Sequence, residues 1–167
     1  MNFGFVIKIV AVFSKQPFLQ ITIRELSKQA KLSYNATHRT VQQLLKEKIL
    51  LQQKYGTVCV LTMNPTSEAI ALLAFTAYKD AEKWKIEKKY RNSHLPKNIF
   101  SIINIKNELM AIGESRQTDS IVLDGGEIKL MTIHELIAAL SNHTLTLDKI
   151  KIFQGAEYLF EKIVESK

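Results

Sequence analysis

The 167-residue sequence predicts an α+β fold in which helices and one hairpin come first and a small α/β domain comes last. Two observations favour it. Apolar residues recur at helical spacing in several stretches, whereas short runs rich in Val, Ile and Thr stand between turn residues elsewhere. Hydrophobic residues make up 46% of the chain and charged residues 23%, which is typical of a folded protein and excludes a disordered or collagen-like one. No run of about 18 apolar residues occurs, so no membrane-spanning segment is expected.

The first stretch, residues 3–14, is expected to form a buried helix. Its apolar residues are too dense for period alone to separate helix from strand, and its length favours a helix. Pro17 ends it, because the residue before a proline is pushed out of the helical region. Residues 19–21 then predict a short extended piece.

Two helices joined by a tight turn are expected next. Thr22 and Glu25 fit a capping box that opens a short helix, with Leu26 and Ala30 facing inward. Ser33 is a natural N-cap for the second helix, residues 33–47. One face of this helix is apolar: Thr37, Val41, Leu44 and Leu45. The other positions remain free for solvent or a partner: Tyr34, Asn35, His38, Arg39, Gln42 and Lys46.

A β-hairpin is predicted after these helices. Residues 49–53 and 57–63 are strand-like, and Lys54-Tyr55-Gly56 is the expected tip because Gly56 tolerates a positive φ. The order helix, short strand, helix, turn, helix and hairpin is that of a winged helix-turn-helix, which is therefore predicted for residues 1–66. In that fold Thr22 and Lys28 are placed to touch phosphates, and Lys54 and Tyr55 to reach the DNA backbone or the minor groove.

The rest of the chain is predicted as a connecting helix and a second domain. A long helix over 67–92 carries an apolar stripe that reaches Trp84, and its end is rich in lysine. The segment 92–96 is the expected boundary, and 97–167 is the expected α/β domain. Strands are predicted at 99–105, 121–123 and 127–131, with Asp124-Gly125-Gly126 as a hairpin signal. A second capping box at Thr132 and Glu135 opens a helix to about Leu140, and a last helix follows Gly155.

Charge is distributed unevenly along the chain, whose total is +7. Residues 1–66 contain nine Lys and Arg but two acids, residues 67–98 have a net charge of +3, and residues 99–167 have one of −3. The excess in the first third favours a polyanionic partner, double-stranded DNA. A solvated basic surface that binds nothing is the alternative.

Residues 3–64 resemble the winged-helix domains of archaeal and bacterial transcription regulators. The resemblance rests on 23–30 (IRELSKQA), 32–39 (LSYNATHR), Val41, Leu44 and 49–50. It implies a sequence-specific DNA-binding regulator, a homodimer and not an enzyme, with the 33–47 helix in the major groove; some such domains bind only protein. It also implies DNA contacts: to bases from Tyr34, Asn35, His38, Arg39 and Gln42, and to phosphates from Lys46 and Lys54, with Ser33 at the helix start.

Two positions depart from the pattern of these regulators. Thr37 stands where a buried Val or Ile is usual, and Lys48 stands where Gly is usual. Other roles for the site residues also stay open. Arg39 can pair with Glu25 or Glu47, His38 can be an idle surface residue, and Tyr34 and Tyr55 can cover the core.

The last part of the chain is similar to the tail of minimal nucleotidyltransferase domains. The similarity is carried by 130–132, 134–136 and 152–160. Active members need a Gly-Ser turn followed by Asp-x-Asp, which hold the triphosphate and Mg²⁺. Here Glu114 interrupts Gly113 and Ser115, and Asp119 is one carboxylate where two are required. A structural or dimerising remnant is therefore expected, and an active nucleotidyltransferase is the alternative function.

No catalytic, metal or cofactor site is predicted. His94, His134 and His143 lack metal-ligand spacing, and neither a nucleophile–base pair nor a Gly-rich phosphate loop is present. Cys59 is a single cysteine, expected in the core, and favours a reducing, cytoplasmic compartment. Lys8 interrupts the apolar start, so a signal peptide is not expected.

Overall fold

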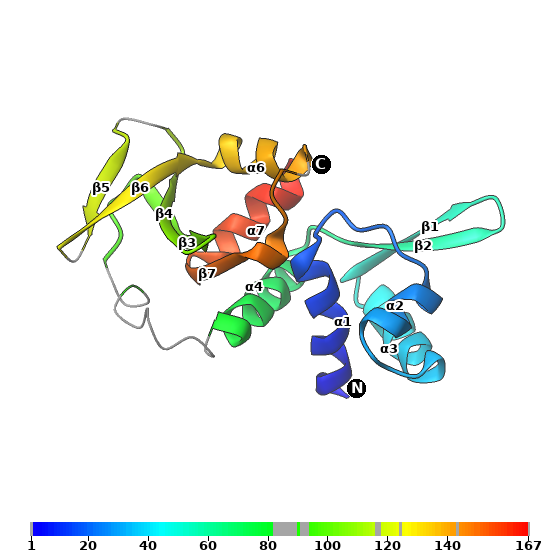
Figure 1. Cartoon of the computed structure of the whole chain (residues 1–167). Helices are drawn as coiled ribbons and strands as arrows, with labels where there is room; N and C mark the ends of the chain where they lie inside the picture. The colour runs from blue at the N-terminus through cyan, green and yellow to red at the C-terminus, as the bar shows by residue number, and fades with distance from the viewer. Residues whose placement is uncertain are drawn as a thin grey trace. The chain divides into compact units, whose positions relative to one another are not determined.

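A computed structural model of the chain describes residues 2–81, 90, 94–115, 118–123, 125–142 and 144–166. The fold is α+β, as predicted: helices and a β-hairpin come first, and a five-stranded mixed sheet with helices follows (Figure 1). The chain divides into two compact units, Met1–Thr76 (unit 1) and Ala77–Ser166 (unit 2). Within the described residues, no helix combines the length and the hydrophobicity needed to cross a bilayer.

Three helices pack together in unit 1: α1 (Phe3–Lys15), α2 (Ile23–Gln29) and α3 (Tyr34–Lys46). The predicted helices are confirmed to within one or two residues. The inward positions are also confirmed, since Leu26, Ala30, Thr37, Val41 and Leu44 are buried and Leu45 is half-buried. Thr40 is buried as well, and its hydroxyl donates to the carbonyl of Ala36 at 2.9 Å.

The hairpin consists of β1 (Leu50–Tyr55) and β2 (Val58–Met63), which pair antiparallel. Ile21 forms an isolated antiparallel bridge with Leu61, so the predicted extended piece contacts the hairpin at one residue pair and forms no strand of its own. The predicted tip, 54–56, was misplaced: Lys54 pairs with Cys59 and Tyr55 with Val58, so both belong to β1 and the turn consists of Gly56 and Thr57. Gly56 has φ +59°, the positive value that two-residue hairpin turns require.

Each helix of the α2–α3 pair is followed by a lysine in the left-handed conformation, two residues after its last helical residue. Lys31 has φ +53° and Lys48 has φ +58°. After α3, the amide of Lys48 donates to the carbonyl of Leu45 and the amide of Ile49 to that of Leu44, which together form a Schellman motif. The same two bonds follow α2. The left-handed backbone explains why glycine suits position 48, where this chain has lysine.

The next helix, α4 (Ser67–Ala81), contains the division between the units, which lies upstream of the segment 92–96 predicted as the boundary. The predicted continuation of this helix to residue 92 falls largely on 82–89 and 91–92, outside the described residues. These include Trp84 and the lysines at 83, 85, 88 and 89.

The sheet of unit 2 has the strand order β5-β6-β4-β3-β7. Its strands are β3 (Ile99–Ile105), β4 (Glu108–Gly113), β5 (Ser120–Leu123), β6 (Gly126–Thr132) and β7 (Ile150–Gln154). The β4–β6 pair is parallel and the other pairs are antiparallel. The sequence analysis predicted β3, β5 and β6 and missed β4 and β7. The β5–β6 hairpin is confirmed, although Asp124 lies outside the described residues.

Two helices and a 3₁₀ turn complete unit 2: α6 (Ile133–Ser141), η2 (Leu147–Lys149) and α7 (Ala156–Glu165). The capping box predicted for α6 is complete, because Thr132 and Glu135 bond reciprocally. At α2 only one half forms: the Thr22 hydroxyl accepts from the amide of Glu25 at 3.2 Å, whereas the Glu25 carboxylate lies 3.5 Å from Lys28 Nζ. α7 packs on β3 and α6 packs on α7.

Candidate nucleic-acid interface

The exposed face of α3 holds the residues predicted to contact DNA. All six of its predicted positions are exposed: Tyr34, Asn35, His38, Arg39, Gln42 and Lys46. They are held in place by the opposite face, where Thr37, Val41 and Leu44 are fully buried. The helix therefore presents a polar stripe on a fixed support, since its buried residues set its rotation.

The stripe begins at the start of α3, where the ring of Tyr34 lies beside His38 with 6.1 Å between the ring centroids. Tyr34 is 51% exposed and Tyr55 is 56% exposed, so neither covers the core. Thr22 and Ser33 are the N-caps of α2 and α3, and each hydroxyl accepts a hydrogen bond from its own helix. Each hydroxyl hydrogen is left to donate, for example to a phosphate oxygen.

Cationic side chains of unit 1 are mostly unpaired. Of its nine Lys and Arg, only Lys28 forms an ion pair with a described residue, namely Glu25. The two carboxylates proposed as alternative partners of Arg39 have other partners: Glu25 pairs with Lys28, and Glu47 accepts a hydrogen bond from Gln43 at 3.2 Å. Arg39 pairs with neither of them. The positive charge of the α3 stripe is thus available to a ligand.

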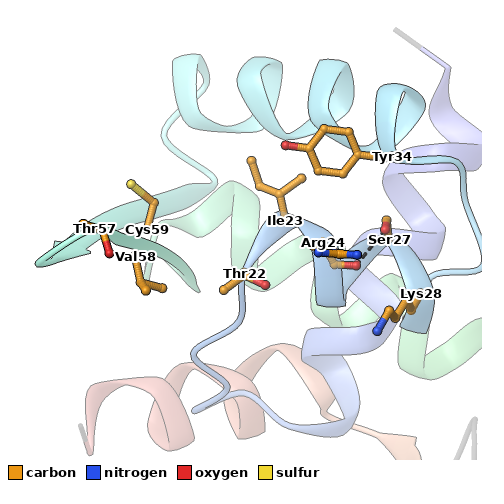
Figure 2. A pocket seen from close by; sticks show the side chains of 9 residues that line it. All are labelled: Thr22, Ile23, Arg24, Ser27, Lys28, Tyr34, Thr57, Val58 and Cys59. Atoms are coloured by element: carbon orange, nitrogen blue, oxygen red, sulfur yellow. Dashed lines mark hydrogen bonds between the residues drawn. The ribbon is translucent and has the colours of Figure 1, made fainter.

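A depression of about 800 Å³ lies beside this stripe (Figure 2). It is bounded by α2, by the first residue of α3 and by the hairpin turn with the start of β2. Its lining residues are Thr22, Ile23, Arg24, Ser27, Lys28, Tyr34, Thr57, Val58 and Cys59. Three residues predicted to contact DNA, Thr22, Lys28 and Tyr34, therefore share one concave surface.

Arg24 also lines this depression, although the sequence analysis did not select it. Its side chain is exposed, and it follows the N-terminal residue of α2. Its position in the sequence could have identified it, because Arg24 is a cation in the first turn of the helix that begins after Thr22, a predicted phosphate contact. Cys59 is half-buried at the rim rather than in the core, which corrects its predicted place. Cys59 shares the strand face of the buried Leu61 and Met63, but it lies beside the hairpin turn, where the hairpin extends past most of the buried residues.

The two predicted contacts on the hairpin lie on opposite faces of it. Lys54 pairs with Cys59 in register with the buried Leu50 and Leu61, so it shares the face that packs on the helices. Tyr55 pairs with Val58 on the other face, and its hydroxyl donates to Gln53 Oε1 at 2.8 Å. A ligand that lies along one face of the hairpin therefore contacts either Lys54 or Tyr55, and not both.

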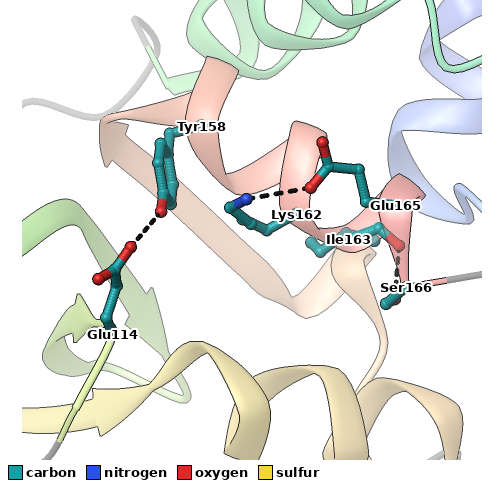
Figure 3. A network of polar contacts seen from close by, with 6 residues as sticks. All are labelled: Glu114, Tyr158, Lys162, Ile163, Glu165 and Ser166. Carbon is teal, nitrogen blue, oxygen red and sulfur yellow. Dashed lines mark hydrogen bonds and ion pairs between the residues drawn. The ribbon is translucent and has the colours of Figure 1, made fainter.

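In unit 2, the described positions that were compared with a nucleotidyltransferase are not gathered with other potential metal ligands. Gly113 ends β4, and the exposed Glu114 accepts a hydrogen bond from the hydroxyl of Tyr158 at 2.8 Å (Figure 3). Asp119 is exposed, and its carbonyl accepts from the amide of Leu130. Among the described residues, no three His, Cys, Asp or Glu side chains gather to hold a metal. His143 lies outside them, and Ser115 precedes the undescribed residues 116–117.

Comparisons with known proteins do not assign a family. No protein-family model matches the chain, and no curated protein and no solved structure shows significant similarity to it. The resemblances stated above therefore stay predictions.

Proposed function

We propose that unit 1 is a winged helix-turn-helix and that the chain is a sequence-specific, double-stranded-DNA-binding transcription regulator that acts as a homodimer. The single observation that carries this proposal is the α3 stripe. Six polar or cationic side chains are exposed on one helix whose opposite face is fully buried. In the same proposal, the sheet of unit 2 is a small C-terminal α/β domain without catalytic function, which follows a connecting helix.

The dimensions of α3 suit the major groove. Its 13 residues span about 20 Å, and a helix fits a groove that is about 12 Å wide. Side-chain chemistry supports base reading. The Arg39 guanidinium matches guanine O6 and N7, and the amides of Asn35 and Gln42 match adenine N6 and N7.

The depression in Figure 2 supports contacts to the phosphate backbone. Arg24 and Lys28 supply positive charge along its α2 side, and Thr22 supplies a hydroxyl. Such contacts fix the position of a protein on the duplex without reading sequence. Lys46, at the end of α3, and Lys54, on the face of the hairpin toward the helices, extend this charge.

The proposal is tested by selecting bound sequences from a random DNA library. A dimer is expected to return an inverted repeat whose half-sites are about 34–36 Å apart. The affinity for the selected site is then measured against salt concentration for the wild type and for Arg39→Ala with Lys46→Ala. The double variant is expected to bind about 30- to 1000-fold more weakly and to lose about one unit of the log–log salt slope.

Lys97→Ala with Lys129→Ala is the matched control, because it removes two exposed charges from unit 2. Its affinity for the selected site is expected to equal that of the wild type. Wild-type binding that does not depend on salt, or equal losses in both double variants, would contradict the proposal. DNA-independent capture of a protein partner with no enrichment of any DNA sequence would instead favour the protein-interaction alternative.

A further inference from the structure

A pocket of about 610 Å³ lies within unit 2, between α6 and α7. Its volume is in the range of pockets that bind small organic molecules. Apolar side chains of α6 form one wall: Ile133 is buried, Ile137 is half-buried and Ala138 is exposed. Ile133 and Ile137 are four residues apart and therefore lie on one side of this helix. A ligand that fits this wall has an apolar body.

The other wall is polar and belongs mainly to α7. Tyr158, Lys162 and Glu165 follow one another on α7 at spacings of four and three residues, so they lie on one side of it. Lys162 Nζ lies 3.0 Å from the Glu165 carboxylate and 5.4 Å from the centroid of the Tyr158 ring (Figure 3). This wall therefore already holds one ammonium group, that of Lys162, by a carboxylate and the face of an aromatic ring.

Glu114, which follows β4, supplies a second carboxylate at the same pocket. It is exposed and accepts a hydrogen bond from the Tyr158 hydroxyl at 2.8 Å, and it forms no ion pair with a described residue. Burial raises the pKa of Tyr158 above its usual value and the hydrogen bond to Glu114 adds to the shift, so this hydroxyl is a neutral donor at pH 7. A neutral donor leaves the negative charge of Glu114 available to a cationic ligand.

The charges around the pocket select the class of ligand. With histidine counted as neutral, the lining residues carry two carboxylates and one ammonium, a net charge of −1. The pocket also includes the last turn of α7, the negative end of the helix dipole, which favours cations. At α6 the positive end of the dipole is already compensated by Glu135, whose carboxylate accepts from the amide of Thr132 at 2.8 Å. Charge complementarity therefore favours a cation over an anion.

We propose that this pocket binds a small organic amine, that is, a protonated amino group on an apolar body. The amino group donates to Glu114, and the apolar body lies along Ile133, Ile137 and Ala138 of α6. Every lining residue belongs to unit 2, so the inference does not rest on the DNA binding proposed for unit 1.

The test is a titration of the full chain, followed by ¹H–¹⁵N NMR, with three probes of similar size: 4-phenylbutylamine, 4-phenylbutanol and 4-phenylbutanoate. The amine is expected to bind saturably with a dissociation constant on the order of 1 mM, given its roughly eleven non-hydrogen atoms. Its binding should shift the amide signals of 133–138 and 158–166. The alcohol and the carboxylate are expected to bind at least about tenfold more weakly, because they lack the positive charge that pairs with Glu114.

Glu114→Gln is expected to weaken binding of the amine at least about tenfold and to leave binding of the alcohol unchanged, since glutamine still accepts from Tyr158 but carries no charge. Glu127→Gln is the matched control: Glu127 is also an exposed carboxylate of unit 2 that accepts from a hydroxyl, that of Ser120, and it does not line the pocket. Its variant should bind the amine as the wild type does. Ala138→Phe, at an exposed position, is expected to fill the pocket and abolish binding of both amine and alcohol.

The outcomes that would overturn the inference are equally specific. They are the absence of saturable amine binding at about 10 mM, equal affinities for the three probes, and equal losses in the two glutamine variants. Tighter binding of the carboxylate than of the amine would also overturn it, because the pocket would then select an anion. The amide spectrum of each variant shows whether it is folded, so a loss of binding is separated from a loss of structure.

Discussion

The two units of the molecule differ in the charged groups that they leave without a partner among the described residues. In unit 1, eight of nine cationic side chains form no ion pair with a described residue. In unit 2, six carboxylates accept hydrogen bonds or ion pairs from neighbours: Glu108, Glu114, Glu127, Glu135, Glu157 and Glu165. Two of these six, Glu108 and Glu165, pair with a lysine, whereas in unit 1 a single described lysine, Lys28, pairs with a described carboxylate.

Left-handed backbone occurs in both units, but the positions differ in whether a side chain can be accommodated. Unit 1 uses Lys31 and Lys48, whose side chains tolerate this conformation at a cost. In unit 2, Gly155 has φ +74° and starts α7 where a Cβ would stand 1.7 Å from the carbonyl oxygen of Phe100. At Lys31 and Lys48 the cost lies in the backbone conformation alone, so residues other than glycine can occupy these positions. At Gly155 a side chain would also collide with the backbone of Phe100, so this position requires glycine.

The largest expected effect comes from Gly155→Ala, which tests the steric side of this contrast. The methyl group meets the backbone of Phe100 and Ser101 at a positive φ, and we expect the free energy of unfolding to fall by about 3–5 kcal/mol. Urea unfolding measures the loss, and hydrogen exchange is expected to place it in β3, β7 and α7. Gly125→Ala is the control, because Gly125 has a similar φ of +75° with nothing within 4 Å. Equal losses in the two variants would show that the contact with Phe100 does not matter.

A smaller effect on stability is expected at Lys48, a non-glycine residue of unit 1 in the left-handed conformation. Lys48→Gly should stabilise the chain by about 1 kcal/mol relative to Lys48→Ala, since both remove the charge and only glycine relieves the left-handed backbone. Thermal and urea unfolding of the two variants give this difference. A more stable alanine variant would show that the entropy of the unfolded chain outweighs the strain at this position.

Thr37→Val tests the polar residue in the core of unit 1. The Thr37 side chain is fully buried and its hydroxyl donates to the carbonyl of Ser33 at 3.0 Å, which also accepts from the amide of Thr37. Because valine leaves that carbonyl bonded, we expect stability to change by at most about 1 kcal/mol, in the stabilising direction. Urea unfolding measures it. Thr40→Val, in which a buried hydroxyl is removed in the same way, should behave alike, and a large loss in either would assign a structural role to the hydroxyl.

The smallest effect is a pH dependence in unit 2. Burial raises the pKa of Tyr78 above its usual value of 10.0, and its hydrogen bond to Glu157 adds to the shift. The folded state thus holds this proton more tightly than the unfolded state. This tighter binding of the proton adds to the free energy of unfolding. The added stability is fully present below pH 10 and is lost as the pH rises from 10 through the pKa that Tyr78 has in the folded state. We expect Tyr78→Phe to reduce this loss, as measured by urea unfolding at several pH values. Identical profiles in wild type and variant would contradict the shift.

Local signals in the sequence predicted unit 1 almost completely. The signals that predicted it each act over a few residues: the caps at Thr22 and Ser33, the apolar spacing along α3, and Gly56 in the hairpin. Such signals can be recognised in the sequence without knowledge of the fold. The exposed α3 stripe was predicted for the same reason, because burial of Val41 and Leu44 determines which side of the helix faces outward.

Unit 2 was predicted less well because its missing strands depend on partners remote in sequence. β4 contains Glu, Leu, Met and Ala, which favour a helix, yet it is extended because β3 and β6 pair with it on either side. The turn before it is formed by Lys106 and Asn107, both at positive φ, without the glycine that marks such turns.

The sequence by itself determined the helices and hairpin of unit 1, the charge imbalance between the two parts and the candidate DNA-contacting residues, because these follow from neighbours within about one helical turn or one strand pair. Only the tertiary structure decided that Arg24 joins Thr22 and Tyr34 around one depression, that Lys54 and Tyr55 face opposite ways, and that Phe3 meets Phe75. Each of these depends on segments brought together by packing, which no local pattern encodes.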